Sequence, residues 1–377
     1  MIFYVVKGAP DSCGRGCDSW IEAEGKIDTG TAARLKVFLG RLRDRNLPIY
    51  FASPGGNLDQ AVVMGGMLHA KPTIARVGRT LVRECGFEAQ DSDVCVKFKQ
   101  SGRELHGALF TRGAICASAC PYVFAGAAVH EVAPDAVLAV HSPKIFFTMH
   151  GGPVDPSVVA AAAERGHERA DRMVATYLAK VGIDAGLLGL TKTVKFEDIH
   201  ILTRDEIARF GLDRREQVET PWKFEGDKSS MMHKVAVVQR PGEKSFRLLQ
   251  WRVACVDAKR LELDFQRPAL ANANFASVSI AGNDTKPTYF VYPPATAPGI
   301  EQWGLRMPQP ALQSLLDRPE IEIIETSIDA AGQRVPQTIK LSNDGWDGAL
   351  ESLLAVCRQP RDSAAARASR SGNATAK

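Results

Sequence analysis

Residues 116–120 read Cys-Ala-Ser-Ala-Cys, at the point where a strand-like run gives way to a helix of small residues. Pro121 fits the first turn of that helix, because the backbone N–H that proline lacks would have no partner there. Ser118 therefore stands where the helix begins, and the positive end of the helix dipole favours alkoxide character on its oxygen. The alanines on either side leave room for a substrate. The same five residues also suit a serine that only caps a helix.

Residues 53–56 read Ser-Pro-Gly-Gly and follow another strand-like run, Leu-Pro-Ile-Tyr-Phe-Ala at 47–52. The proline stops the strand, and Gly55 and Gly56 supply backbone freedom and close approach. Asn57 can cap the helix that follows. The two glycine N–H groups therefore lie near a helix N-terminus, where developing negative charge is favoured. A plain turn between strand and helix is the better explanation of this segment taken alone.

Residues 136–140, Ala-Val-Leu-Ala-Val, form a third strand-like run, and His141 closes it. A single histidine at a strand end is usually a surface or packing residue. This one follows the serine segment with one short strand between them. Backbone donors, a serine and a histidine in that order are the parts of an acyl-transfer site, which needs an oxyanion hole, a nucleophile and a general base.

The three segments, taken in order, resemble the proteolytic subunit of Clp protease and the wider crotonase-like superfamily. Residues 201–212 are similar to that family's closing helix and Gly-Leu turn. Cys13 and Cys17 before Asp-Ser-Trp-Ile, the motif Cys-x-Ser-Ala-Cys, and Ile199-His-x-Leu-Thr resemble most a bacterial set of Clp-protease-like proteins predicted to be periplasmic. The resemblance covers about residues 2–215 and implies an α/β fold with a crotonase-like (ClpP-like) ββα spiral core.

The resemblance implies a role for four residues of this sequence. Ser118 matches the nucleophile and His141 the general base. Gly56 matches one oxyanion donor, and the N–H of Ala119, directly after the nucleophile, matches the other. No cofactor and no metal ion are expected. The implied activity is a serine hydrolase of the peptidase kind, with a peptide or protein as substrate and a homo-oligomer as a possible assembly.

The third member of a catalytic triad does not match. Where the family places its aspartate, residues 189–195 read Gly-Leu-Thr-Lys-Thr-Val-Lys, without a carboxylate. Asp198 lies just downstream and can replace the acid only if the loop differs. Thr191 or Thr193 can orient His141 instead, or the enzyme works as a dyad. The orienting group fixes the tautomer and the ring position of the base, so its loss is costly.

Three functions therefore compete. The first is a serine peptidase or related hydrolase that uses Ser118 and His141. The second is a catalytically degenerate ClpP-like periplasmic protein that serves in binding or as a scaffold, which the missing acid and an additional β domain favour. The third is a crotonase-type acyl-thioester enzyme. Two points count against the third: Ser118 and His141 match the peptidase pattern, and an exported protein rarely meets a coenzyme-A ester.

Composition sets wider limits on what this protein does. The 377 residues suggest two domains, and 45% of them are hydrophobic, enough for real cores. With 47 Lys and Arg against 43 Asp and Glu, the net charge of +4 favours neither nucleic acid nor a membrane surface as a partner. No stretch approaches a membrane span. The N-terminal Met-Ile-Phe-Tyr-Val-Val-Lys is too short for a signal peptide and fits a first strand better.

Domain organisation follows from a change in pattern along the chain. Strands alternate with helices over residues 1–222, which predicts a parallel sheet covered on both faces, with a cysteine-bearing insertion at about 79–112. Residues 229–358 carry β-branched and aromatic runs separated by turn residues, which predicts a mostly antiparallel accessory β domain. Helices are expected there at 309–316 and 346–357. Residues 361–377 are rich in Ala, Ser and Arg and are expected to be disordered.

Eight cysteines bear on the cellular compartment: Cys13, Cys17, Cys85, Cys95, Cys116, Cys120, Cys255 and Cys357. An even count in close pairs indicates disulfides and an oxidising compartment, hence a periplasmic or secreted protein. We expect Cys255 to pair with Cys357 and Cys85 with Cys95. The sequence cannot decide whether Cys116 pairs with Cys120. Buried thiols in a cytosolic protein remain an alternative, and zinc is disfavoured because the spacing of a structural zinc site is missing.

Overall fold

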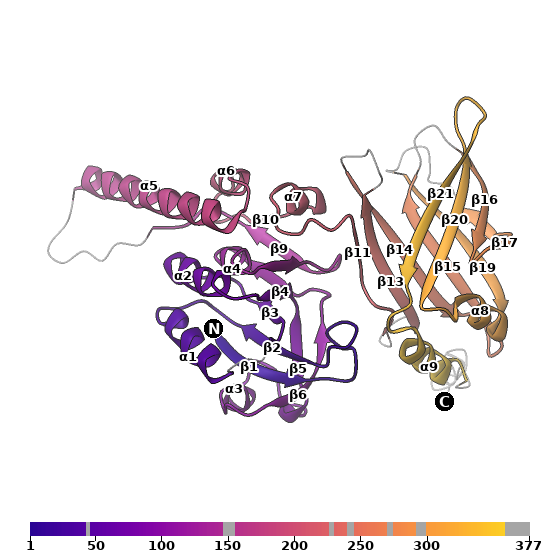
Figure 1. The fold of residues 1–377 in the computed structure, drawn as a ribbon, viewed down its shortest axis with the longest axis horizontal. Coiled ribbons are helices and arrows are strands. Elements are labelled where there is room, and N and C mark those ends of the chain that lie inside the picture. The colour runs from indigo at the N-terminus through magenta and orange to yellow at the C-terminus, as the bar shows by residue number, and fades with distance from the viewer. Residues whose placement is uncertain are drawn as a thin grey trace, which may run out of the picture. The chain divides into compact units, whose positions relative to one another are not determined.

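The computed structural model describes residues 1–42, 46–145, 155–225, 230–239, 245–269, 274–291 and 299–358. The chain divides into two compact units (Figure 1). The first comprises residues 1–218 and 239–246, and the second comprises 219–238 and 247–377. The tail at 361–377, expected to be disordered, lies outside the described residues.

A seven-stranded mixed sheet forms the centre of the first unit, in the order β5-β6-β1-β2-β3-β4-β8. The parallel pairs are β1 with β6, β2 with β3, β3 with β4 and β4 with β8, whereas β1 pairs with β2 and β5 with β6 antiparallel. The sheet is therefore not the purely parallel one that was predicted, because a short cysteine hairpin joins β1 to β2 where a parallel pair needs a longer crossover. The strands are β1 Ile2–Lys7, β2 Ser19–Glu24, β3 Ile49–Ala52, β4 Ile74–Val77, β5 Arg79–Val82, β6 Leu105–Phe110 and β8 Val129–Glu131.

Alternation along β2 divides its side chains between two apolar clusters. Ile21 and Ala23 face a core that is completed by the helices α1 (Thr31–Arg41), α2 (Leu58–His69) and α4 (Cys120–Phe124). Trp20 faces a smaller cluster on the other side of the sheet. Asn57 caps α2 as predicted, since its side chain accepts a hydrogen bond from the N–H of Gln60 at 2.9 Å.

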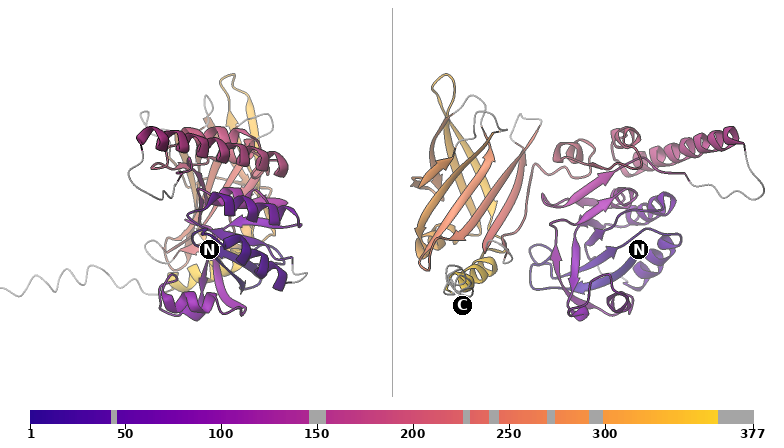
Figure 2. Two further views of the ribbon diagram at one scale, coloured as in Figure 1. Left: turned by 90° about the vertical axis from the view of Figure 1, so that its left-hand side faces the viewer. Right: turned by 180° about the vertical axis from the view of Figure 1, so that it is seen from behind.

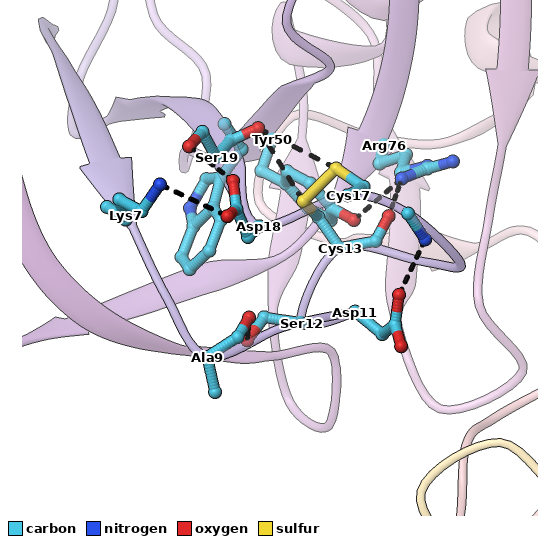
Figure 3. The surroundings of a disulfide bond; sticks show 12 residues. Lys7, Ala9, Asp11, Ser12, Cys13, Cys17, Asp18, Ser19, Tyr50 and Arg76 are labelled. Carbon is cyan, nitrogen blue, oxygen red and sulfur yellow. Dashed lines mark hydrogen bonds and ion pairs between the residues drawn. A yellow bond between two sulfur atoms is a disulfide. The ribbon is translucent and has the colours of Figure 1, made fainter.

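The smaller cluster lies under the insertion at 79–112, which contains the 3₁₀ turn η1 (Arg83–Cys85) and the helix α3 (Asp93–Lys99). The disulfide Cys85–Cys95 joins η1 to α3. A second disulfide, Cys13–Cys17, closes the hairpin loop between β1 and β2. Beside it, Arg76 from β4 donates hydrogen bonds to the carbonyl of Cys13 and to the Tyr50 hydroxyl (Figure 3).

A three-stranded sheet, in the order β10-β9-β7, completes the first unit. Its strands are β7 (Ile115–Ala117), β9 (Val137–Val140) and β10 (His200–Ile201), and the helices around it are α5 (Pro156–Val181), α6 (Gly186–Thr193) and α7 (Arg204–Arg209). The helix α5 buries side chains only near its C-terminal end, and its other end extends past the rest of this unit (Figure 1; Figure 2).

The second unit contains two further sheets, ordered β11-β13-β14-β15-β19-β18, with β12 beside β13, and β17-β16-β20-β21. The pairings described strand by strand in it are antiparallel, and one apolar cluster includes residues of both sheets and both helices. The disulfide Cys255–Cys357 joins β14 to α9. The elements are β11 Gln217–Glu219, β12 Lys223–Glu225, β13 Met231–Gln239, β14 Phe246–Cys255, β15 Arg260–Pro268, β16 Asn274–Ile280, β17 Asn283–Thr285, β18 Tyr289–Val291, β19 Ile300–Pro308, α8 Gln309–Leu316, β20 Glu320–Ile328, β21 Arg334–Ser342 and α9 Trp346–Cys357.

Candidate active site

Three strand ends bring the sequence motifs together in the first unit. The Ser-Pro-Gly-Gly turn after β3 lies beside β7, because the N–H of Ser53 donates to Ile115 O at 2.7 Å and the N–H of Ala117 donates to Ser53 O at 2.9 Å. β7 runs parallel to β9 with Ala117 opposite Ala139. The serine turn and His141 therefore follow the carboxyl ends of neighbouring parallel strands, as the residues of an α/β site commonly do.

Ser118 occupies a left-handed backbone conformation, with φ of 59°. A residue with a side chain pays about 1–2 kcal/mol for this conformation, so the surroundings must hold it. Its N–H donates to Ala139 O at 2.9 Å, and its side chain is half-buried. The helix α4 begins only at Cys120 and has five residues, so Ser118 lies in the turn before the helix and not in its first turn.

Glycine is required beside this turn for steric reasons. A Cβ atom on Gly55 would lie 2.5 Å from Ala117 O, 2.6 Å from Ser118 Cβ and 2.8 Å from the backbone N of Ala119. Ordinary contacts of such an atom begin at about 3.4 Å. Gly55 also has φ of 90°, a conformation that glycine adopts without strain. The glycine turn therefore packs directly against the serine turn.

Two backbone N–H groups in the glycine and serine turns have no hydrogen-bond partner among the described residues. The N–H of Gly55 donates to its own neighbour, Ser53 Oγ, at 3.1 Å. The carbonyl of Gly55 and the N–H of Asn57 both bond to Ile27. Within the described ranges, no hydrogen bond is recorded for the N–H of Gly56 or of Ala119, the two groups that the sequence suggests as oxyanion donors. Both donors are therefore unused within the described part of the protein.

His141 makes an orienting hydrogen bond that could not be predicted from the sequence. Its Nδ1 lies 2.9 Å from the backbone carbonyl of Ser142. A carbonyl can only accept, so Nδ1 carries a hydrogen, and in the neutral ring Nε2 is then the nitrogen with the lone pair that a general base needs. The ring also packs edge-on against Phe196, with centroids 5.0 Å apart. The N–H of Ser142 donates to Val194 O at 2.9 Å, which places the segment after α6 next to the histidine.

None of the side chains suggested as orienting groups is hydrogen-bonded to His141 among the described residues. Thr191 is buried in α6, where its hydroxyl donates to Leu187 O at 2.8 Å and receives the Tyr122 hydroxyl at 3.4 Å. The Thr193 hydroxyl donates to Leu190 O at 2.7 Å. Asp198 is exposed, and among the hydrogen bonds of the described residues none joins it to His141. None joins Ser118 Oγ to His141 either, and in empty active sites this contact is often long.

A buried carboxylate holds the closing segment of this unit in place. Asp213 accepts hydrogen bonds from the Arg215 side chain at 2.6 Å and from the N–H of Val132, just after β8, at 2.9 Å, and it pairs with Arg204 at 3.0 Å. Burial alone would raise the pKa of Asp213, but these three donors outweigh burial and lower it to about 2.

The cysteines form four disulfides: Cys13–Cys17, Cys85–Cys95, Cys116–Cys120 and Cys255–Cys357. The two predicted pairs are confirmed, and Cys116–Cys120 answers the question that the sequence left open. All eight cysteines are therefore in disulfides, and the part of the chain that is described holds no cluster of three or more metal-binding side chains. No helix in the same residues is long and apolar enough to span a membrane.

Comparisons with known proteins give little further information. No protein-family model and no curated protein matches the chain. The solved structures that match half of it include a mutant of the membrane-bound stomatin-specific protease 1510-N and a mutant of ClpP1 from Listeria monocytogenes. They are 14% and 15% identical, each over 51% of this chain, and the matches cover 75% and 87% of those chains. Both TM-scores are 0.31, too low to support an argument about fold or activity.

Proposed function

We propose that this protein is a serine hydrolase, most closely a peptidase, with Ser118 as nucleophile and His141 as general base. One observation carries the proposal. Ser118 is held in a left-handed turn against Gly55, beside two backbone N–H groups without recorded partners and one strand away from His141. A left-handed serine at the end of a strand is costly to maintain, and nucleophilic serines on other folds occupy a similarly strained turn after a strand.

The chemistry follows from the roles of these groups. His141 Nε2 removes the proton of Ser118 Oγ while that oxygen attacks the carbonyl carbon of the substrate. The N–H groups of Gly56 and Ala119 receive the oxyanion of the tetrahedral intermediate, and removing one such donor in other enzymes costs about 10²–10³-fold in rate. His141 returns the proton to the leaving group. Water then attacks the acyl-enzyme with His141 again as base.

The orienting role belongs, in this proposal, to the carbonyl of Ser142. A carbonyl on Nδ1 fixes the tautomer as a carboxylate does, but it carries no full charge to stabilise the imidazolium. The catalytic unit is then a dyad supported by main chain, with Asp198 as a candidate only if residues 194–198 rearrange. Asp198→Asn separates the two cases. If Asp198 is the third acid, the catalytic rate of the variant falls about 10⁴-fold, and if Asp198 has no role, the rate does not change.

Labelling by a fluorophosphonate tests the proposal directly. The wild-type protein should form a covalent adduct on the peptide that contains Ser118, and His141→Ala should slow its formation by orders of magnitude. Ser118→Ala should abolish the adduct with unchanged thermal unfolding. Ser101→Ala, at an exposed serine of the same unit, is the matched control and should be labelled at the wild-type rate. Equal labelling of Ser118→Ala and wild type would refute the assignment.

A catalytically degenerate binding or scaffold protein is the second candidate. The observation that favours it is the lack, within the described residues, of a carboxylate bonded to His141. In that case the wild-type protein binds peptides but forms no adduct. For either candidate we propose a periplasmic or secreted location and a possible homo-oligomer. The four disulfides support an oxidising compartment. Mass mapping of exported protein and light scattering test the two statements.

A further inference from the structure

We infer that the Cys116–Cys120 disulfide is a positioning device for the nucleophile and not only a stabilising cross-link. The inference rests on the proposed function of Ser118. The bond joins the strand β7 to the first residue of α4, and Ser118 is the middle residue of the loop that it closes. Only three residues, 117–119, therefore lie between two covalently connected points.

Cys116 is fixed by main chain on both sides. It lies opposite Leu138 of β9 in the parallel ladder and opposite Ser53 of the glycine turn. Its side chain is fully buried, as is that of Cys120, and both belong to the main apolar core of the unit. The disulfide thus extends the rigidity of two neighbouring strand ends to the start of α4.

The start of α4 needs such support. The helix has five residues, fewer than a helix needs to be stable by itself, and Ser118 before it has an unfavourable φ of 59°. Apart from the disulfide, hydrogen bonds hold each residue of the turn: Ala117 N–H to Ser53 O, Ser118 N–H to Ala139 O, and Tyr122 N–H to Ala119 O. Of these, only the bond of Ser118 ties the serine itself to a neighbouring strand, and the contact with Gly55 adds to it. A reacting serine must be held within a fraction of an ångström of its productive position, so a covalent brace across it has a direct catalytic use.

The hairpin disulfide Cys13–Cys17 provides a matched control. It has the same sequence separation of 4 and lies in the same unit. It lies near Tyr50 (Figure 3). Cys13, Trp20 and Tyr50 belong to the smaller cluster, which is separate from the core that holds Cys116. Removing either bond opens a loop of equal length. If both bonds act only by restricting the unfolded chain, the two removals should therefore cost equal stability and leave the position of Ser118 alike.

The experiment compares C116A/C120A with C13A/C17A in the full-length protein. We expect the rate of fluorophosphonate labelling to fall about 10–100-fold in C116A/C120A and to stay within about twofold of wild type in C13A/C17A, at a temperature where both are folded. Equal labelling rates of the two variants, with the wild type labelled, would overturn the inference and leave the proposed function intact.

Hydrogen exchange of the Ser118 amide gives a readout that does not depend on activity. If the wild type is not labelled, the proposed function fails, and faster exchange of this amide in C116A/C120A alone still supports the brace, whereas unchanged exchange overturns it. If C116A/C120A does not fold, the wild type is partly reduced at several denaturant concentrations, and the freed thiols are alkylated and identified by peptide mapping. The labelling rate of Ser118 should then fall in proportion to the fraction of molecules in which Cys116–Cys120 is open. A labelling rate that does not depend on this fraction would reject the inference.

Discussion

Replacing Gly55 by alanine tests whether the contact between the two turns sets the position of the nucleophile. The new Cβ would lie 2.5–2.8 Å from three atoms of residues 117–119, so these atoms must move by about 0.6–0.9 Å to reach the ordinary contact distance of 3.4 Å. The positive φ of 90° adds about 1–2 kcal/mol, and overpacking adds about 1–3 kcal/mol. We expect a total loss of about 2–5 kcal/mol in unfolding free energy.

The rate of labelling should fall even under conditions where the variant is fully folded. A displacement approaching 1 Å at a reacting group costs about 10²-fold in rate, so fluorophosphonate labelling of Gly55→Ala should fall by about that factor well below its unfolding temperature. Gly113→Ala is the control, since Gly113 has a similar φ of 68° with nothing within 4 Å of its added Cβ. It should lose about 1–2 kcal/mol of stability and keep the wild-type labelling rate. Wild-type labelling of Gly55→Ala, or equal losses in both variants, would refute the reasoning.

Three further predictions concern stability. C255A/C357A opens a loop with a sequence separation of 102 and should lose up to about 4.7 kcal/mol of unfolding free energy in urea. Tryptophan fluorescence is the suitable probe, because four of the five tryptophans lie in the second unit, and an unchanged free energy would exclude the bond. Asp213 has a folded pKa of about 2, below its ordinary 3.8, so its stabilisation of about 2 kcal/mol is present above pH 4 and lost as the pH falls through 2. Asp213→Asn should therefore be less stable than wild type at pH 7, with a difference that shrinks towards pH 2; a constant difference would contradict this. Burial raises the pKa of Glu22, whose Oε1 has no partner, so the protein loses stability as the pH rises through that pKa, and Glu22→Gln should melt higher than wild type at pH 8 but not at pH 4.

Local sequence signals determined the regular elements well where neighbouring residues decide them. The helices expected at 309–316 and 346–357 are α8 and α9, with the same bounds in the structure. Asn57 marked the start of α2, and the pairing of Cys255 with Cys357 followed from their isolation in the second half of the chain. Each of these features depends on residues that are near one another in the sequence, or on a covalent bond between two cysteines, so the sequence alone is enough to predict it.

Long-range packing decided what the sequence left open or misjudged. The antiparallel pairing of β1 with β2 made the first sheet mixed, because the hairpin that joins them closes directly. The order of candidate motifs was visible in the sequence, but only the parallel pairing of β7 and β9 puts Ser118 and His141 on the same edge. The orienting carbonyl of Ser142 could not be predicted, because every residue has a carbonyl and only its direction in the folded chain makes this one a partner of His141.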